Sequence, residues 1–133
     1  MENIDKLKQL TDKLPPIPKL RELVIEEHDN VIEYDTTEGY TLGRGLMNKK
    51  DICVQDMLLT KGADFPAHNH IKEIEYGIIY KGSIEVTIDG KKQIVKAGDC
   101  VKFDKGSVHT GTALETTKLL AVAIPRIDGY PQS

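Results

Sequence analysis

The pattern of apolar and polar residues changes its period once along the chain. Near the amino terminus apolar residues recur at helical spacing, with lysine and aspartate between them, which predicts a short amphipathic helix. The stripe consists of Ile4, Leu7, Leu10 and Leu14. The run 15–18 contains three prolines and ends the helix, because proline lacks an amide hydrogen and clashes with the preceding turn. Residues 1–30 are therefore expected to form this helix and a proline-rich connector.

From residue 31 to residue 125 the period is close to two, and turn-forming residues interrupt it at short intervals. The clearest hairpin is the alternation over 84–88, which the dipeptide Asp89-Gly90 turns into the strand 92–96. Many short strands without a long helix predict an all-β sandwich or barrel, followed by an irregular tail over 126–133. The expected strands are 31–34, 40–47, 52–60, 74–80, 84–88, 92–96, 100–103, 108–114 and 118–124.

Composition narrows the class of protein. Apolar residues make up 39% and charged residues 29% of the 133 residues, as in an ordinary soluble domain. The net charge of −3 offers no general attraction to nucleic acid or to anionic lipid, so neither is an expected partner. The first residues carry no signal-peptide pattern, and no apolar run is long enough to span a bilayer. We therefore expect a cytoplasmic protein.

The two cysteines, Cys53 and Cys100, both lie in strand-like runs. Their spacing matches neither a zinc ribbon nor a redox pair. In a reducing compartment we expect both to be small buried apolar residues.

Two of the four histidines form the sequence His68-Asn69-His70. On a strand, residues two apart share a face and lie about 6.5–7 Å from each other. Two imidazoles at that spacing can bind one metal ion, although the pair alone is also typical of surface residues. His28 lies in a charged stretch and is expected to be a surface residue.

A frame of glycines surrounds the histidine pair. The order along the chain is Gly62, five residues, His68, one residue, His70, four residues, Glu75, six residues and Gly82. After fifteen intervening residues a second frame begins, with Gly98, Asp104, Gly106 and His109. Together the two frames resemble the two sequence motifs of the cupin family. The second departs from the family pattern at Asp104, where proline is usual, and at Ala113, where asparagine is usual.

The resemblance implies a cupin-type double-stranded β-helix, or jelly-roll barrel, over residues 31–125, with the short helix before it. It also implies one divalent transition-metal ion held by three imidazoles and one carboxylate. The corresponding residues are His68, His70, Glu75 and His109. Glu73 competes with Glu75 for the carboxylate position, and the spacing to Gly82 favours Glu75. Iron, manganese, nickel, copper and zinc all suit this set of ligands.

Such a centre has open coordination positions, so the resemblance implies that it binds a small oxygen-bearing organic ligand. The expected lining includes Gly77 and Ile79, then Phe65, Met57 and Phe103. A metalloenzyme of the dioxygenase, isomerase or sugar-modifying type is one implied function. A non-catalytic sensor or binding module is an alternative, and a metal-free sugar epimerase is a weaker one. Small cupins commonly pair through their sheets, so a homodimer is expected.

Overall fold

The computed structural model describes residues 5–6, 31–68 and 72–127, with the backbone alone for residues 66–68. Its regular elements are almost all β-strands, as expected for the fold class. The strands are β1 (Val31–Tyr34), β2 (Thr41–Lys49), β3 (Ile52–Leu59), β4 (Asp64–His68), β5 (Ile74–Lys81), β6 (Ser83–Ile88), β7 (Lys91–Lys96), β8 (Cys100–Phe103), β9 (His109–Ala113) and β10 (Thr117–Ile124). The whole stripe that predicted the amino-terminal helix, Ile4, Leu7, Leu10 and Leu14, lies outside the described residues.

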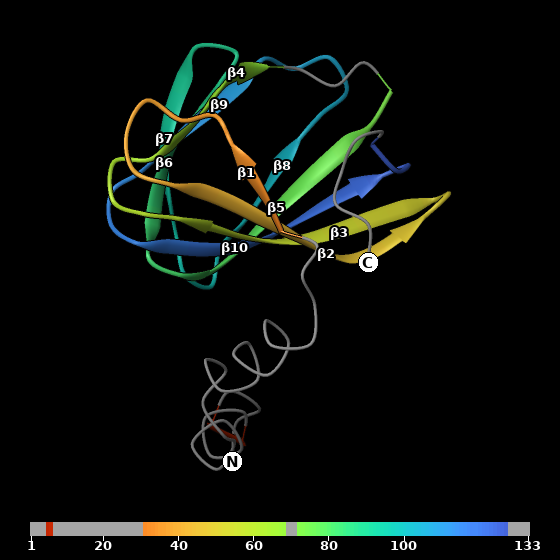
Figure 1. The fold of residues 1–133 in the computed structure, drawn as a ribbon, viewed down its shortest axis with the longest axis horizontal. Helices are drawn as coiled ribbons and strands as arrows, with labels where there is room; N and C mark the ends of the chain where they lie inside the picture. Colours follow the sequence, from red (N-terminus) through yellow and green to blue (C-terminus); the bar gives the residue numbers. More distant parts are fainter. Residues whose placement is uncertain (1–4, 7–30, 69–71, 128–133) are drawn as a thin grey trace.

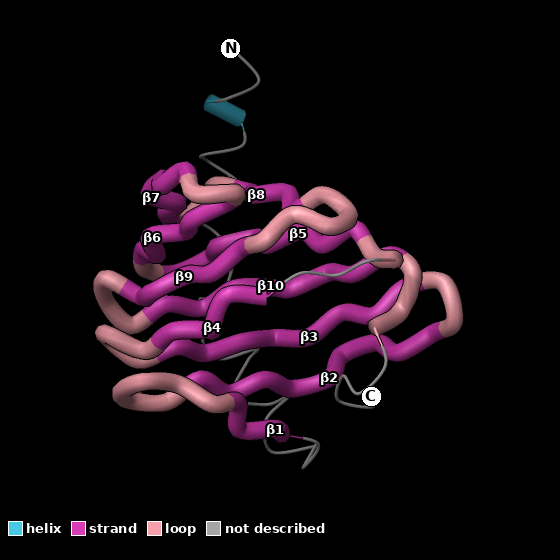
Figure 2. Tube along the Cα trace, turned by 90° about the horizontal axis from the view of Figure 1, so that it is seen from above, coloured by secondary structure: helices cyan, strands magenta, loops and turns pink. Residues whose placement is uncertain are grey.

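The strands form two antiparallel sheets that face each other (Figure 1). The larger has six strands in the order β1-β2-β3-β10-β5-β8, and Figure 2 shows the run from β5 to β1 side by side. The smaller has four strands in the order β4-β9-β6-β7. Consecutive strands β3, β4 and β5 therefore alternate between the sheets, which is how a jelly roll closes its barrel.

The hairpin expected at Asp89-Gly90 is confirmed. Asp89 has φ 48° and Gly90 has φ 82°, the positive values that a two-residue primed turn requires. The same turn is tied to the start of β9, because Asp89 N donates to the carbonyl of Val108 and Val108 N donates to Asp89 Oδ1, both at 2.9 Å. This contact holds the first residue of β9, His109, beside the end of β6.

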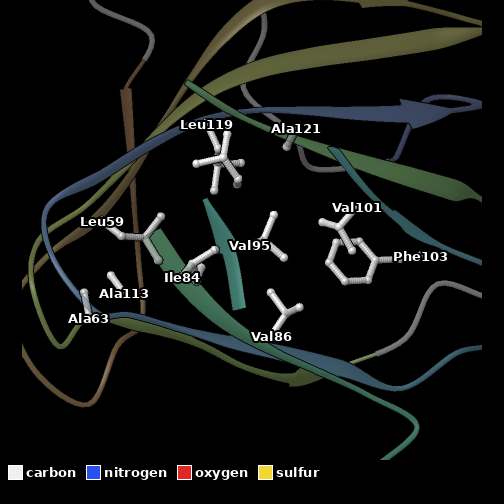
Figure 3. Close-up of a cluster of buried hydrophobic side chains, with 11 residues drawn as sticks. Leu59, Ala63, Ile84, Val86, Val95, Val101, Phe103, Ala113, Leu119 and Ala121 are labelled. Atoms are coloured by element: carbon white, nitrogen blue, oxygen red, sulfur yellow. The ribbon is translucent and has the colours of Figure 1, made fainter. Parts of the chain in front are cut away.

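The inward faces of both sheets pack into one apolar core. Figure 3 shows these side chains converging from the two sheets, with Phe103 and Val101 towards one end and Leu59 and Ala63 towards the other. The buried cluster comprises Leu59, Ala63, Ile79, Ile84, Val86, Val95, Val101, Phe103, Ala113, Leu119 and Ala121. Leu59 and Ala63 fill the end away from Phe103, where the buried threonines Thr41 and Thr117 pair with Leu59 across the sheet.

One expectation about the cysteines is wrong. Cys53 is buried on β3, but Cys100 is exposed at the start of the edge strand β8. Its neighbours Val101 and Phe103 take the inward positions of that strand, so the alternation turns Cys100 outward. Both thiols are free. Within the described residues no helix combines the length and apolar character needed to cross a membrane.

Candidate metal centre

His109 lies inside the barrel, at the first position of β9. Its side chain is 1% exposed, and its ring stacks on Phe103 with the centroids 4.1 Å apart and the planes at 16°. Phe65 approaches the same ring edge-on, with the centroids 6.4 Å apart. The imidazole Nδ1 lies 3.1 Å from the carbonyl oxygen of Ser107, an acceptor that favours the proton on Nδ1. This fixes the ring orientation and leaves Nε2 with the lone pair that a metal needs.

Glu75 reaches the same place from the other sheet. It lies on β5, is 8% exposed, and its Oε1 is 3.9 Å from His109 Nε2. Its cross-strand partner on β8 is Phe103, the residue that stacks on the imidazole. The competing carboxylate, Glu73, precedes β5 and is half-buried. A nitrogen and a carboxylate oxygen from two sheets therefore meet at the polar end of the barrel, and both are ligand types that divalent transition metals accept.

The remaining two predicted ligands are only partly described. His68 is the last residue of β4, and its backbone pairs in register with His109. His70 lies outside the described residues, as does His28. No group of three or more histidine, cysteine, aspartate or glutamate side chains that could hold a metal occurs in the part of the chain that the structure describes. His109 and Glu75 thus supply half of the predicted set, and the chemistry of these two fits the ion.

A second polar group lies on the inward face, and the sequence reasoning missed it. Tyr34 Oη donates a hydrogen bond to Gln55 Oε1 at 2.9 Å, and Gln55 is 2% exposed. Burial, and to a smaller extent the charge of Glu75, raise the pKa of Tyr34 above its ordinary value, so the phenol stays protonated at neutral pH. The sequence does contain a signal for the burial of Gln55, because Gln55 lies on the same strand face as the apolar residues Cys53, Met57 and Leu59. A polar residue in such an apolar row is expected to be buried.

The residues that were expected to line the ligand site largely face the inside of the barrel. Gly77 and Ile79 lie on the inner face of β5, and both are buried. Phe65 and Met57 pack against the core from β4 and β3, and Phe103 belongs to it. Burial raises the pKa of the Cys53 thiol, which disfavours the reactive thiolate at this position.

Comparison with known proteins agrees with this architecture. The family model described as a cupin domain matches residues 55–125. The pectin degradation protein KdgF of Dickeya dadantii (strain 3937) is 31% identical over 91 residues, which cover 65% of this chain and 83% of that protein. The L-ectoine synthase of Teredinibacter turnerae is 34% identical over 71 residues, 52% of this chain, and the chain spans only 53% of its length.

Among solved structures, KdgF from a Halomonas species superposes with a TM-score of 0.68. The match covers 77% of this chain and 91% of the other, at 24% sequence identity. At that identity the similarity shows the fold alone.

Proposed function

Because the chain belongs to the cupin family, we propose that its barrel binds one divalent transition-metal ion through His68, His70, Glu75 and His109. The ion is iron, manganese, nickel, copper or zinc, and it would supply open coordination positions to a small oxygen-bearing organic ligand. The observation that carries the proposal is the approach of His109 Nε2 to Glu75 Oε1 at 3.9 Å, with both side chains almost fully buried.

The strand register also supports this assignment, because the backbone of His68, the last residue of β4, pairs directly with that of His109, the first residue of β9. Two of the proposed ligands therefore lie next to each other on adjacent strands.

Metal binding to the purified protein tests the proposal. We expect one equivalent of metal by elemental analysis, and Co²⁺ titrated into the metal-free protein should give an absorption spectrum of a nitrogen- and oxygen-ligated ion. Loss of a residue that only supports a ligand typically weakens metal binding by about 10–100-fold. His109→Ala removes a ligand itself, so we expect a loss of about 100-fold or more, whereas the control His28→Ala should bind like the wild type.

The same titration decides between the two carboxylates. Glu75→Gln should weaken Co²⁺ binding by about tenfold or more, and Glu73→Gln should leave it unchanged, because Glu75 is the carboxylate observed 3.9 Å from His109 Nε2. Equal binding by the wild type and His109→Ala would refute the metal centre. An effect of Glu73→Gln alone would move the carboxylate role to that residue.

The names of the relatives favour an enzyme over a non-catalytic binding module. One curated relative is named a pectin degradation protein and the other an L-ectoine synthase, and both names describe the breakdown or the synthesis of a compound. Turnover of small metabolites by the metal-loaded protein, abolished in His109→Ala, would support catalysis. Ligand binding without turnover would support the sensor function.

We also propose that the protein is a cytoplasmic homodimer that pairs through the outer face of the larger sheet. That face carries Ile78, which is 39% exposed, beside the half-buried Leu120 and Val122 of the adjacent strand β10. Apolar patches on a sheet are typical of contact surfaces. Size-exclusion chromatography with light scattering should give the mass of two chains, and Ile78→Lys should shift it towards one.

A further inference from the structure

Lys91 lies on the same face of the smaller sheet as His109. In the strand register Lys91 is opposite Ile88, and Ile88 is opposite His109. Directly opposed residues of antiparallel strands have their side chains on one face of the sheet. Ile88 packs against the core and His109 is 1% exposed, so this is the inner face. Lys91, which is exposed at the start of the edge strand β7, therefore ends the row of inner positions that contains the imidazole.

The backbone at Lys91 is fixed relative to His109. The turn Asp89-Gly90 precedes Lys91, and two hydrogen bonds of 2.9 Å join Asp89 to Val108, the residue before His109. Two steps of about 4.5–5.5 Å across the ladder separate the Cα atoms of Lys91 and His109 by about 10 Å. The four-carbon stem of lysine is flexible, so it can bring the ammonium to a ligand that lies between the two strands.

The ammonium of Lys91 differs from that of the next residue in having no ion pair with any of the described residues. Lys92 lies on the opposite face of β7, and its Nζ is 3.8 Å from Glu85 Oε1. The carboxylate closest to Lys91 in sequence, that of Asp89, accepts a hydrogen bond from the amide of Val108. Lys91 thus places a positive charge at the His109 end of the barrel, where it can attract an anionic group of a ligand.

The charges at this end of the barrel favour a ligand with two anionic groups. A divalent ion held by neutral imidazoles and one carboxylate keeps a net charge of about +1, which one anionic oxygen of the ligand would balance. A second anionic group would then meet the ammonium of Lys91, and a hydrogen bond between two charged groups is stronger than one between neutral groups. A neutral group of the same shape would gain much less at this position.

We propose that Lys91 binds a second anionic group of the ligand, a carboxylate or a phosphate, while the first anionic group binds the metal ion. The inference rests on the proposed metal centre and specifies its ligand as a small organic dianion. Lys91 would then be a specificity-determining residue, because it distinguishes dianionic ligands from monoanionic ones without contributing to metal binding.

Acids of equal shape test the proposal with Co²⁺-loaded protein. Glutarate and 5-oxohexanoate differ only in a terminal carboxylate or methyl ketone. We expect the wild type to bind glutarate about tenfold more tightly, about twofold because either carboxylate can bind the ion and about fivefold from the ion pair. Lys91→Met should keep only the twofold advantage, and Lys91→Arg should keep the full preference. Adipate and 6-oxoheptanoate repeat the comparison over a longer span, and 4-phosphonobutanoate, if it binds more tightly than glutarate, identifies the second group as a phosphate.

Two controls separate this inference from the metal centre. Lys92→Met removes the same charge from the opposite face of β7 and should retain the full preference for glutarate. Co²⁺ affinity without any acid should agree within about twofold in all four proteins, because an exposed charge at this distance is screened. Failure of the wild type to bind Co²⁺ would refute the metal centre. Normal Co²⁺ binding would instead overturn only the role of Lys91 if no acid binds, if each dianion binds no better than its ketone, or if both methionine variants lose the preference equally.

Discussion

Replacing Gly82 by alanine should destabilise the barrel far more than the same change at Gly90. Both glycines have nearly the same backbone conformation, with φ 83° and 82°, so the cost of placing an L-residue in the left-handed region, about 1–2 kcal/mol, is common to both. The difference is the space around the new methyl group. At Gly82 a Cβ would lie 2.3 Å from the carbonyl oxygen of Thr116 and 2.9 Å from Thr117 Cα, whereas at Gly90 nothing lies within 4 Å.

The atoms near Gly82 belong to backbone that is fixed on several sides. Thr117 Oγ1 donates to the carbonyl of Ser83 at 2.8 Å, and Ala97 N donates to the carbonyl of Gly82 at 3.0 Å. Relief of the clash must therefore move the turn between β5 and β6 away from the start of β10. Overpacking of this kind costs about 1–3 kcal/mol. We expect a free energy of unfolding about 2–5 kcal/mol below wild type for Gly82→Ala and about 1–2 kcal/mol below it for Gly90→Ala.

Urea unfolding of the metal-free proteins, followed by far-ultraviolet circular dichroism, measures this difference. With a slope of about 2 kcal/mol per molar, a 2 kcal/mol gap separates the two midpoints by about 1 M urea. Midpoints that agree within about 0.2 M would show that the turn relaxes freely, and the steric reasoning about Gly82 would then be wrong.

Two further predictions use the same free energy of unfolding. Gly43→Ala should lower the free energy of unfolding by at least about 1 kcal/mol more than Gly77→Ala, because the new methyl group displaces the Tyr34–Gln55 pair. At Gly77 the nearest atom to a new methyl group, Val101 Cγ1, is 3.2 Å away. Equal urea midpoints for the two variants would contradict this prediction. The hydroxyl and the amide of Thr37 donate to the Asp64 carboxylate and hold its pKa below the usual value. The carboxylate therefore stabilises the folded state at pH values above the unfolded pKa of 3.8, and this stabilisation is lost as the pH falls through the folded pKa. The stability difference between wild type and Asp64→Asn should therefore shrink as the pH is lowered from 5 to below 3, and a constant difference would count against the argument.

The strands could be predicted because alternation and turn residues are local signals. The segments 31–34 and 100–103 match β1 and β8, and the other predicted strands differ from the observed ones by one or two residues at their ends. β4 was not predicted as a strand of its own, since Pro66 interrupts its five residues and they do not alternate. The placement of β10 between β3 and β5 is a long-range pairing that no local pattern encodes.

The site was predicted from motif spacing, which identifies residues but not their surroundings. Spacing selected His109 and Glu75, yet the ring of Phe103 over the imidazole and the carbonyl of Ser107 at Nδ1 are products of the folded sheet. Tyr34 was not predicted as part of the site, because it lies on an edge strand far from both motifs in sequence. Its partner Gln55 is 21 residues away and reaches it only across β2.

At both positions that depart from the cupin pattern, backbone hydrogen bonds hold the local structure in place of the usual side chain. At Asp104 the expected proline is absent, yet Ser107 N and Oγ both donate to the carbonyl of residue 104, at 3.1 and 2.9 Å, and Gly106 has φ 77°. The turn therefore forms without proline, and it presents the Ser107 carbonyl to His109 Nδ1.

At Ala113 the side chain is 2% exposed and belongs to the apolar core, where an asparagine amide would need a hydrogen-bond partner. The main chain of Ala113 instead links the two motifs, because its carbonyl accepts from Gly62 N and its amide donates to the carbonyl of Ala63, both at 2.8 Å. Any residue except proline leaves these two bonds possible, and a small apolar side chain also packs in the cluster that contains Leu59 and Ala63. The loss of asparagine thus leaves the link between the motifs intact, and it does not touch His109 and Glu75, which lie at the opposite end of the barrel from Leu59 and Ala63.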